Sequence, residues 1–407
     1  MLFIIWITLA FCQPSPKELE RMFSPIKSFL SRYIKKEYLS TPLQELQCML
    51  EHPIPGITSI PLPTGHIIVH SDRTRTLHVV KFAIPQILGE GAYKKVYYGA
   101  TLNTEAKTGD LVAFLDNNPK QGADRRHLEH EFNILEEIEN ARTDQQPLKK
   151  IVASTIYAIN FFPDNTPRAK RLVTQEIGRQ IHIPHLYPTK KRKYDGTSQS
   201  FYEIYDFAQR LAEALLTLKQ AQIVHNDLRE INIIKNKQKE LRIIDFSISF
   251  NNKKILFNNS YKRIPYLSAV DILAPETMSY GWTPFQDAPK DINLFHARDI
   301  YAYGTILAES LFDQKVSESQ TECNQYMEQI VYSDDLGARK KRLLPLYTCI
   351  FKYAQNRFEQ LLARTSTPCK TSHKQCALER LVTQCLDPSP SNRPTTEQLY
   401  AYLFPET

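Results

Sequence analysis

The stretch VHNDLREINIIKNKQKELRIIDFSIS, residues 224 to 249, constrains the fold of this 407-residue chain more than any other part of its sequence. It places Asp227, Asn232 and Asp245 at offsets of five and thirteen residues within apolar surroundings. Between Asn232 and Asp245, apolar residues lie on both sides of the polar segment KNKQKE, which is the pattern of a short hairpin. A hairpin here carries the three polar residues to neighbouring loops, so we expect them to face one cleft.

The chemistry of these three side chains suits phosphoryl transfer. Asp227 can accept or orient the proton of a hydroxyl group, and Asn232 and Asp245 supply the hard oxygen ligands that Mg²⁺ prefers. Magnesium usually takes few protein ligands and completes its shell with the phosphates of a nucleotide. One base with two metal ligands therefore predicts a nucleotide-dependent transferase, and the alternative is a set of loop-capping Asx residues.

The remaining periodicity predicts a sheet-rich part followed by a helical part. The short apolar runs HIIVH, LHVVKFAI, KVYYGA and DLVAFLD predict an antiparallel sheet after residue 66. Apolar residues at helical spacing over 126–141 predict one amphipathic helix after these strands. We expect further strands within 150–162 and 169–178, and helices within 202–221, 298–312 and 377–386. This order is typical of an α+β protein with two lobes and a cleft between them.

The N-terminal part predicts an extension in front of the sheet. The apolar run 2–12 is too short for a membrane-spanning helix, which needs about 20 residues, and no Lys or Arg precedes it as in a signal peptide. We expect a cytoplasmic protein without a stable membrane span; the alternative is secretion through the apolar segment 1–14, including delivery into another cell. Residues 15–75 form a helical and proline-rich extension, with a capping box at its start and irregular chain over 53–65.

Composition adds two expectations about partners and redox state. Lys and Arg (51) exceed Asp and Glu (44), a mild excess that fits a phosphate-bearing ligand or a solvated surface, and we expect no nucleic-acid partner. Nothing in the sequence indicates an oligomeric state. The seven cysteines contain no CxxC pair, and this odd, scattered set favours reduced, buried thiols over a disulfide framework.

Several motifs together resemble the eukaryotic-type protein kinases. HNDLREIN resembles their catalytic loop and DFS resembles their metal-binding DFG; APE with Glu276, DIYAYG with Asp299 and LDPSPSNRP with Arg393 follow in the family's order. The resemblance covers roughly residues 80 to 403. It implies that Glu276 pairs with Arg393 and that Asp299 caps the catalytic loop.

This resemblance implies a bilobal protein kinase-like fold with a small sheet-rich N-lobe over 76–180 and a larger helical C-lobe over 181–405. The stretch around 313–376 is longer than the fold requires and is expected to be an insert. ATP and Mg²⁺ are the implied cofactors and a protein is the implied substrate. LGEGAYKKVYYG (88–99) resembles the glycine-rich loop, and LVTQEIG (172–178) resembles the hinge beside the adenine. The residues implied in nucleotide binding are Gly89, Gly91, Val96, Ala113, Glu131, Thr174, Glu176 and Ile177.

One departure from the family bears directly on activity. The third strand of a kinase should end in the lysine of VAIK, yet this chain reads VAFL, with Leu115 at that position. In GEGAYKKV, Lys94 replaces the third glycine, an arrangement similar to that of the "with no lysine" kinases. We expect Lys94 to contact the nucleotide phosphates in place of the missing lysine and to pair with Glu131. The alternatives are that Lys94 is a solvated loop lysine, or that the chain is a pseudokinase that binds without catalysing transfer.

Other departures are milder. Asn226 replaces the arginine of HRD, which implies that no phosphorylated activation loop is required. Ser247 replaces the DFG glycine, and Arg229 stands where serine/threonine kinases carry a lysine that contacts the γ-phosphate. The sequence therefore predicts an ATP- and Mg²⁺-dependent protein kinase that phosphorylates a protein hydroxyl, with Ser or Thr favoured over Tyr. The rival predictions are a pseudokinase scaffold and a small-molecule phosphotransferase.

Overall fold

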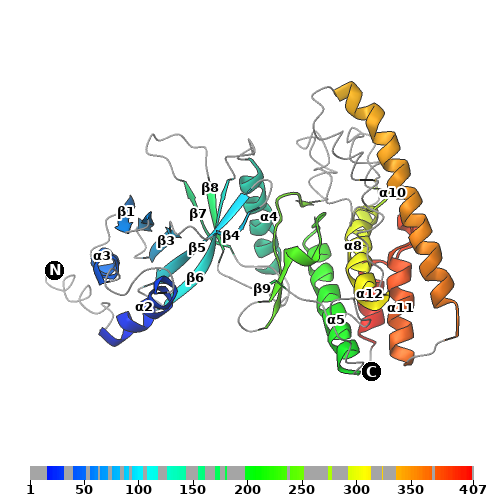
Figure 1. Ribbon diagram of the computed structural model, residues 1–407, viewed down its shortest axis with the longest axis horizontal. Helices are drawn as coiled ribbons and strands as arrows, with labels where there is room; N and C mark the ends of the chain where they lie inside the picture. The colour runs from blue at the N-terminus through cyan, green and yellow to red at the C-terminus, as the bar shows by residue number, and fades with distance from the viewer. Residues whose placement is uncertain are drawn as a thin grey trace. The chain divides into compact units, whose positions relative to one another are not determined.

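The computed structural model contains most of the predicted elements, and the chain divides into two compact units (Figure 1). The first unit comprises Met1–Phe132 and Ala153–Ile177, and the second comprises Asn133–Val152 and Gly178–Thr407. The structure describes residues 16–31, 40–51, 56–62, 65–71, 76–82, 87–90, 94–103, 108–117, 126–143, 155–160, 170–174, 179–180, 198–235, 239–251, 274–276, 292–312, 323, 336–368 and 372–405.

An eight-stranded antiparallel sheet forms the first unit. Its order is β1-β2-β3-β5-β6-β8-β7, and β4 pairs with β5 outside this path. The alternating β-branched and aromatic residues that predicted the sheet therefore do form strands. The strands are β1 (Gly56–Leu62), β2 (Gly65–Ser71), β3 (Thr76–Phe82), β4 (Ile87–Glu90), β5 (Lys94–Asn103), β6 (Thr108–Asn117), β7 (Thr155–Asn160) and β8 (Lys170–Thr174).

Strand β1 corrects the prediction of irregular chain over 53–65. It pairs with β2 along its whole length, from Gly56 opposite Ser71 to Leu62 opposite Gly65. Pro61 does not prevent this pairing, because β1 lies at the edge of the sheet and an edge strand has one side on which no backbone donor is needed. The proline content of the segment was therefore a poor guide to its structure.

Helices α2 (Pro16–Leu30) and α3 (Ser40–Glu51) contact strands of the sheet, and the boundary between the two units falls within α4 (Arg126–Thr143). Helix α2 begins where the predicted capping box starts, contacts β5 and β6, and buries Met22, Phe23, Ile26 and Leu30 at helical spacing. The apolar segment 1–14 lies outside the described residues. Within the part of the chain that the structure describes, no helix combines the length and the apolar character needed to cross a membrane.

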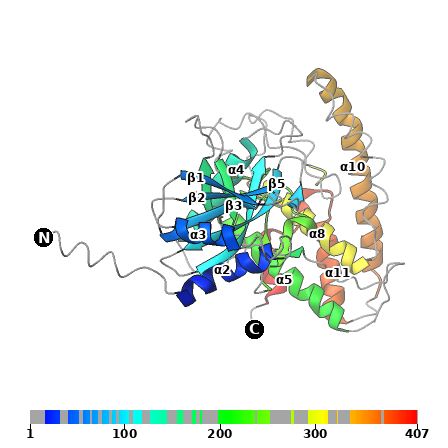
Figure 2. The same cartoon turned by 60° about the vertical axis from the view of Figure 1, so that its left-hand side comes forward.

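The second unit is built mainly from helices. Helix α8 occupies its centre: it contacts α5, α11 and α12, and is buried over most of its length (Figures 1 and 2). A Cβ at Gly304 would lie 2.8 Å from the Cβ of Cys385, so α8 and α11 can approach this closely only with glycine at 304. The helices are α5 (Ser198–Gln220), α8 (Ile292–Phe312), α10 (Leu336–Thr365), α11 (His373–Cys385) and α12 (Thr396–Leu403).

The prediction of reduced thiols is wrong for three cysteines of the second unit. Cys323 and Cys349 form a disulfide, and their Cα atoms lie 5.8 Å apart although 26 residues separate them in the chain. Cys376 is disulfide-bonded as well. Cys48 and Cys385 are free. Spacing along the chain could not reveal the first pair, because the fold and not the sequence separation brings these residues together.

We predict that His296 makes the stability of the second unit depend on pH. It lies buried in α8, and burial, followed by the positive charge of Lys219, lowers its pKa from 6.5 to about 4. Between these values the unfolded chain takes up a proton that the folded chain does not, so the stability must fall as the pH falls. Between pH 7 and pH 4.5 the loss is about 2–3 kcal/mol.

Urea denaturation at a series of pH values measures this effect. His296→Gln should flatten the dependence of the unfolding free energy on pH over this interval, whereas His373→Asn, at an exposed position, should leave it as in the wild type. The same slope in wild type and His296→Gln would show that another group causes the loss.

Candidate active site

A carboxylate of α8 holds the segment that contains the predicted catalytic residues. Asp299 accepts the backbone N–H of His225 at its Oδ2 (2.7 Å) and that of Asn226 at its Oδ1 (2.9 Å). Burial raises the pKa of Asp299, while the hydrogen bonds from these two backbone N–H groups act in the opposite direction. Both oxygens accept a donor, so the ionised carboxylate is the form that fits this arrangement. The predicted capping of the loop by Asp299 is confirmed.

His225 joins this loop to the segment that leads to Asp245. Its Nδ1 accepts the backbone N–H of Asp227 (3.3 Å), so Nε2 carries the proton and donates it to the carbonyl of Ile244 (3.1 Å). The hydroxyl group of Ser249 donates to the His225 carbonyl (2.8 Å), and the edge of Phe246 packs against the imidazole, with ring centroids 4.8 Å apart. The imidazole therefore fixes one loop relative to the other.

Asp227 and Asn232 are in direct contact. The Asn232 amide nitrogen donates to the Asp227 carbonyl (2.8 Å) and to its carboxylate Oδ2 (3.0 Å). A short 3-10 helix, η4 (Glu230–Asn232), makes this contact possible, and the N–H of Asn232 donates to the Arg229 carbonyl (2.9 Å). The Nε of Arg229 lies 3.4 Å from Asp227 Oδ1. Both oxygens of the Asp227 carboxylate thus face positive or donor groups.

The predicted hairpin carries the chain from Asn232 to Asp245. Strands β11 (Ile233–Lys235) and β12 (Leu241–Ile243) are paired antiparallel, and the N–H of Ile244 donates to the Asn232 carbonyl (2.9 Å). Asp245 then adopts a positive φ of 68°, which aspartate tolerates better than most residues. The structure thus brings Asp227, Asn232 and the residue before Asp245 together.

Ser247 makes a contact that the sequence did not reveal. Its hydroxyl group donates to Asp245 Oδ1 at 2.7 Å, and this bond restricts rotation of the carboxylate. The sequence identified Ser247 only as a replacement of the DFG glycine. The residue two positions after an aspartate can form such a bond in many loops, so the signal was present but not specific.

Asn226 fills a structural role at the arginine position of HRD. It adopts a φ of 64°, a conformation in which asparagine is enriched among residues other than glycine. Its amide donates to the Ile248 carbonyl (3.3 Å) and accepts a bond from Arg298 Nη1 (3.3 Å). These buried bonds hold the Asn226 side chain at the position where the family's pattern has an arginine.

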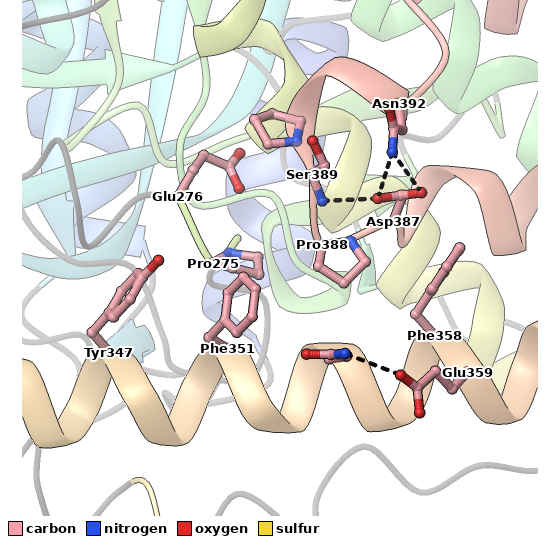
Figure 3. Close-up of a pocket in the computed structure, with 12 residues that line it drawn as sticks. Pro275, Glu276, Tyr347, Phe351, Phe358, Glu359, Asp387, Pro388, Ser389 and Asn392 are labelled. Carbon is pink, nitrogen blue, oxygen red and sulfur yellow. Dashed lines mark hydrogen bonds between the residues drawn. The ribbon is translucent and has the colours of Figure 1, made fainter.

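The predicted pair of Glu276 and Arg393 is present and buried. Arg393 Nη1 and Nη2 donate to the two carboxylate oxygens at 2.7 and 2.8 Å, while Nε donates to the Asp387 carbonyl. The guanidinium also lies over the ring of Tyr301, 4.8 Å from its centroid. Glu276 lines a pocket of about 580 Å³ whose other walls are Pro275, α10 and the loop 387–392 (Figure 3).

The predicted nucleotide-binding residues of the first unit are described mainly through their backbone. Strand β4 contains Gly89, which pairs with Val96 on β5; Ala113 on β6 pairs with Tyr98 on one side and with Thr174 on the other. Lys94 is the first residue of β5, and Glu131 is buried in α4. Gly91, Glu176 and Ile177 lie outside the described residues.

Comparison with known proteins gives consistent matches. The family described as the protein kinase domain matches residues 82–404. Serine/threonine-protein kinase 10 of Mus musculus is 26% identical over 229 residues, which cover 54% of this chain and 20% of that protein. Its counterpart in Danio rerio is 31% identical over 229 residues, 54% of this chain and 19% of that protein. A probable tyrosine-protein kinase of Dictyostelium discoideum is 27% identical over 214 residues, 48% of this chain and 51% of that protein. The matched regions thus span between a fifth and a half of these relatives.

We predict that Asp299→Asn destabilises the chain by about 3 kcal/mol, because an amide can accept only one of the two buried N–H groups. Urea denaturation measures the loss. Asp206→Asn is the control: Asp206 accepts a hydrogen bond from Arg210, but its side chain is 58% exposed, so the change should cost less than about 0.5 kcal/mol. Equal losses of stability in the two variants would show that the buried bonds of Asp299 to the loop stabilise the chain no more than an exposed hydrogen bond does.

Proposed function

The chain belongs to the protein kinase domain family, and we propose that it is an active protein kinase that transfers the γ-phosphate of ATP to a protein hydroxyl group. The observation that supports activity most is the direct contact of Asp227 with Asn232, on a loop held by Asp299. Serine or threonine is favoured as the acceptor because the relatives in Mus musculus and Danio rerio are serine/threonine-protein kinases.

Asp227 acts as the base in this proposal. Its carboxylate Oδ2 is held by the Asn232 amide at 3.0 Å, and its Oδ1 lies 3.4 Å from Arg229 Nε. A carboxylate fixed on both sides can orient an incoming hydroxyl group and accept its proton without first reorganising. Arg229 has its side chain partly exposed, so it can also contact the transferred phosphate.

Asn232 and Asp245 are the proposed ligands of Mg²⁺. The Asn232 amide turns its nitrogen to Asp227, so its oxygen, the hard ligand, points away from that carboxylate. The Ser247 hydroxyl fixes the Asp245 carboxylate from one side. Two oxygen donors suit a cation that takes few protein ligands, and bound Mg²⁺ would neutralise charge on the nucleotide phosphates.

Lys94 is the proposed substitute for the lysine that Leu115 replaces. In the register of β5 and β6, Lys94 lies opposite Asn117, and Val96 lies opposite Leu115. Positions 94 and 115 are therefore diagonal neighbours on one face of the sheet, a separation of about 7–8 Å that a lysine side chain can span. Glu131 in α4 is only 2% exposed, and we propose that its buried carboxylate pairs with Lys94, as the family resemblance implies.

The remaining nucleotide contacts follow the family's pattern. Gly89, Gly91 and Val96 would cover the phosphates and the base, because a hairpin containing glycine allows a close backbone approach. Ala113 and Thr174 lie on paired strands, as expected for residues beside the adenine, and the hinge formed by Glu176 and Ile177 would supply backbone bonds. These assignments give the first unit the proposed contacts to ATP, and the proposed Mg²⁺ ligands belong to the second unit.

Specific residues bear on two rival functions. Leu115 favours a pseudokinase, since leucine cannot neutralise phosphates at the position of the usual lysine. A small-molecule phosphotransferase would share the base and the metal ligands. The buried Glu276–Arg393 pair speaks against that rival, because in the family it belongs to the lobe that holds a protein substrate.

Lys94→Met tests the proposal, with Lys95→Met as the matched control on the neighbouring strand position. Transfer of radiolabel from Mg²⁺-ATP to the kinase itself and to a general protein substrate is measured for all three proteins. The wild type should transfer label, Lys94→Met should lose about 100-fold or more, and Lys95→Met should remain near the wild type, because successive strand positions face opposite sides.

Three outcomes would contradict this account in different ways. A wild type that binds nucleotide without transferring label would identify a pseudokinase. Full activity of Lys94→Met would show that another positively charged group contacts the phosphates. Transfer of label to an added aminoglycoside or sugar, but to no protein, would identify a small-molecule phosphotransferase.

A further inference from the structure

The oxidised cysteines of the second unit are concentrated in the predicted insert. Cys323 lies between α8 and α10 and is 2% exposed, and it is bonded to Cys349 on α10. Cys376, near the start of α11, is disulfide-bonded as well. All three fall within 313–376, the stretch that is longer than the kinase fold requires. The described disulfide-bonded cysteines thus all lie in the predicted insert.

The free cysteines give the contrast. Cys385 lies in the core beside Gly304, where burial raises the pKa of its thiol and keeps it unreactive. Cys48 lies exposed on α3 and is free as well. Among the described cysteines, the bonded ones thus all lie within 313–376 and the free ones outside it.

The position of Cys349 explains what the bridge can stabilise. Helix α10 contacts α11, and one stripe of its surface is buried: Leu346, Ile350, Ala354 and Leu361. Pro345 lies inside the helix just before this stripe and removes a helical hydrogen bond there. The opposite face exposes Phe351 and Leu362. The bridge thus fastens α10 at the end of the stripe where the helix itself is weakest.

A bridge also fixes one wall of the pocket beside Glu276. Tyr347 and Phe351 flank Cys349 along α10, and their rings stack with centroids 6.0 Å apart. Both line this pocket, and Figure 3 shows them on the α10 side, with Pro275 and Pro388 across from the helix. Fastening Cys349 therefore keeps these two aromatic residues in place.

We infer that this kinase matures in an oxidising compartment, where the Cys323–Cys349 bridge forms and fastens the chain at Cys323 to α10. Glutathione and thioredoxin keep structural thiols reduced in the cytosol, so disulfides of this kind are typical of secreted and lumenal proteins. The apolar run 2–12 supplies the matching route, which makes export the favoured alternative over a cytoplasmic location.

The chemistry of the bridge needs an electron acceptor. Joining the two thiols releases two protons and two electrons, and a protein disulfide of an oxidoreductase accepts them by exchange and leaves as a dithiol. Oxidising compartments contain such proteins, whereas the cytosol drives the exchange in the opposite direction.

Thiol mapping in cells tests the inference. The full chain is produced in insect cells with its own N-terminus and, separately, without residues 2–12; both are lysed in denaturant with N-ethylmaleimide and digested without reduction. In the complete chain, mass spectrometry should find the Cys323–Cys349 linked peptide, with Cys48 and Cys385 alkylated. The shortened chain should carry maleimide on both Cys323 and Cys349.

Alkylated Cys323 and Cys349 in the complete chain would overturn the inference, and so would equal amounts of the linked peptide in the two forms. The readout does not depend on phosphoryl transfer. An inactive protein with an intact bridge would therefore refute the proposed function and leave this inference standing.

A pair of variants tests what the bridge does. Replacing Cys323 and Cys349 together by serine should lower the melting temperature of the oxidised protein by roughly 5 to 10 °C and expose α10 to trypsin. Cys48→Ser, which removes a free thiol, should change neither property. A double variant with the melting temperature and trypsin resistance of the wild type would show that the bridge does not stabilise α10.

Discussion

The bonds of Asp299 to two consecutive backbone amides are the interaction on which the proposed active site depends. The carboxylate comes from α8, the central helix of the second unit, and the amides belong to the loop that carries Asp227. Because α8 is packed on several sides, the Asp299 carboxylate is fixed in position, and its two bonds hold the loop in place. Asn232, the hairpin and the approach to Asp245 are then fixed by further short bonds, each between neighbours in this chain of contacts. A catalytic group held in this way needs little reorganisation in the transition state.

The sequence predicted the polar arrangement because its spacing is tied to a hairpin of definite length. Asn232 and Asp245 lie just outside two short apolar runs that pair as a hairpin, so their proximity followed from the pattern. The role of Asp299 and the pairing of Glu276 with Arg393 followed from family resemblance alone. The contact of Ser247 with Asp245, the disulfide of Cys323 and the strand formed by 56–62 were not foreseen. Each of these depends on tertiary proximity or on the position of a strand in its sheet, which local patterns do not contain.

The departures from the family pattern fall into two physical kinds. Asn226 replaces a cation by a neutral side chain that fits a positive φ and satisfies buried partners, so the substitution changes how the loop is supported and leaves the base in place. Leu115 removes a positive charge that phosphoryl transfer requires. In the proposal Lys94 supplies this charge, because the pairing of β5 with β6 puts position 94 beside position 115 on the same face.

The central claim is that the fixed loop performs transfer and does not merely surround a bound nucleotide. Asp227→Asn tests this most directly, because an amide keeps the shape of the side chain but cannot accept the proton. ATP affinity is measured by titration calorimetry, and transfer to protein is measured in a single turnover with enzyme in excess over labelled ATP. The account predicts unchanged affinity and a rate lower by about 10²–10⁴-fold. Equal rates for the variant and the wild type would contradict it.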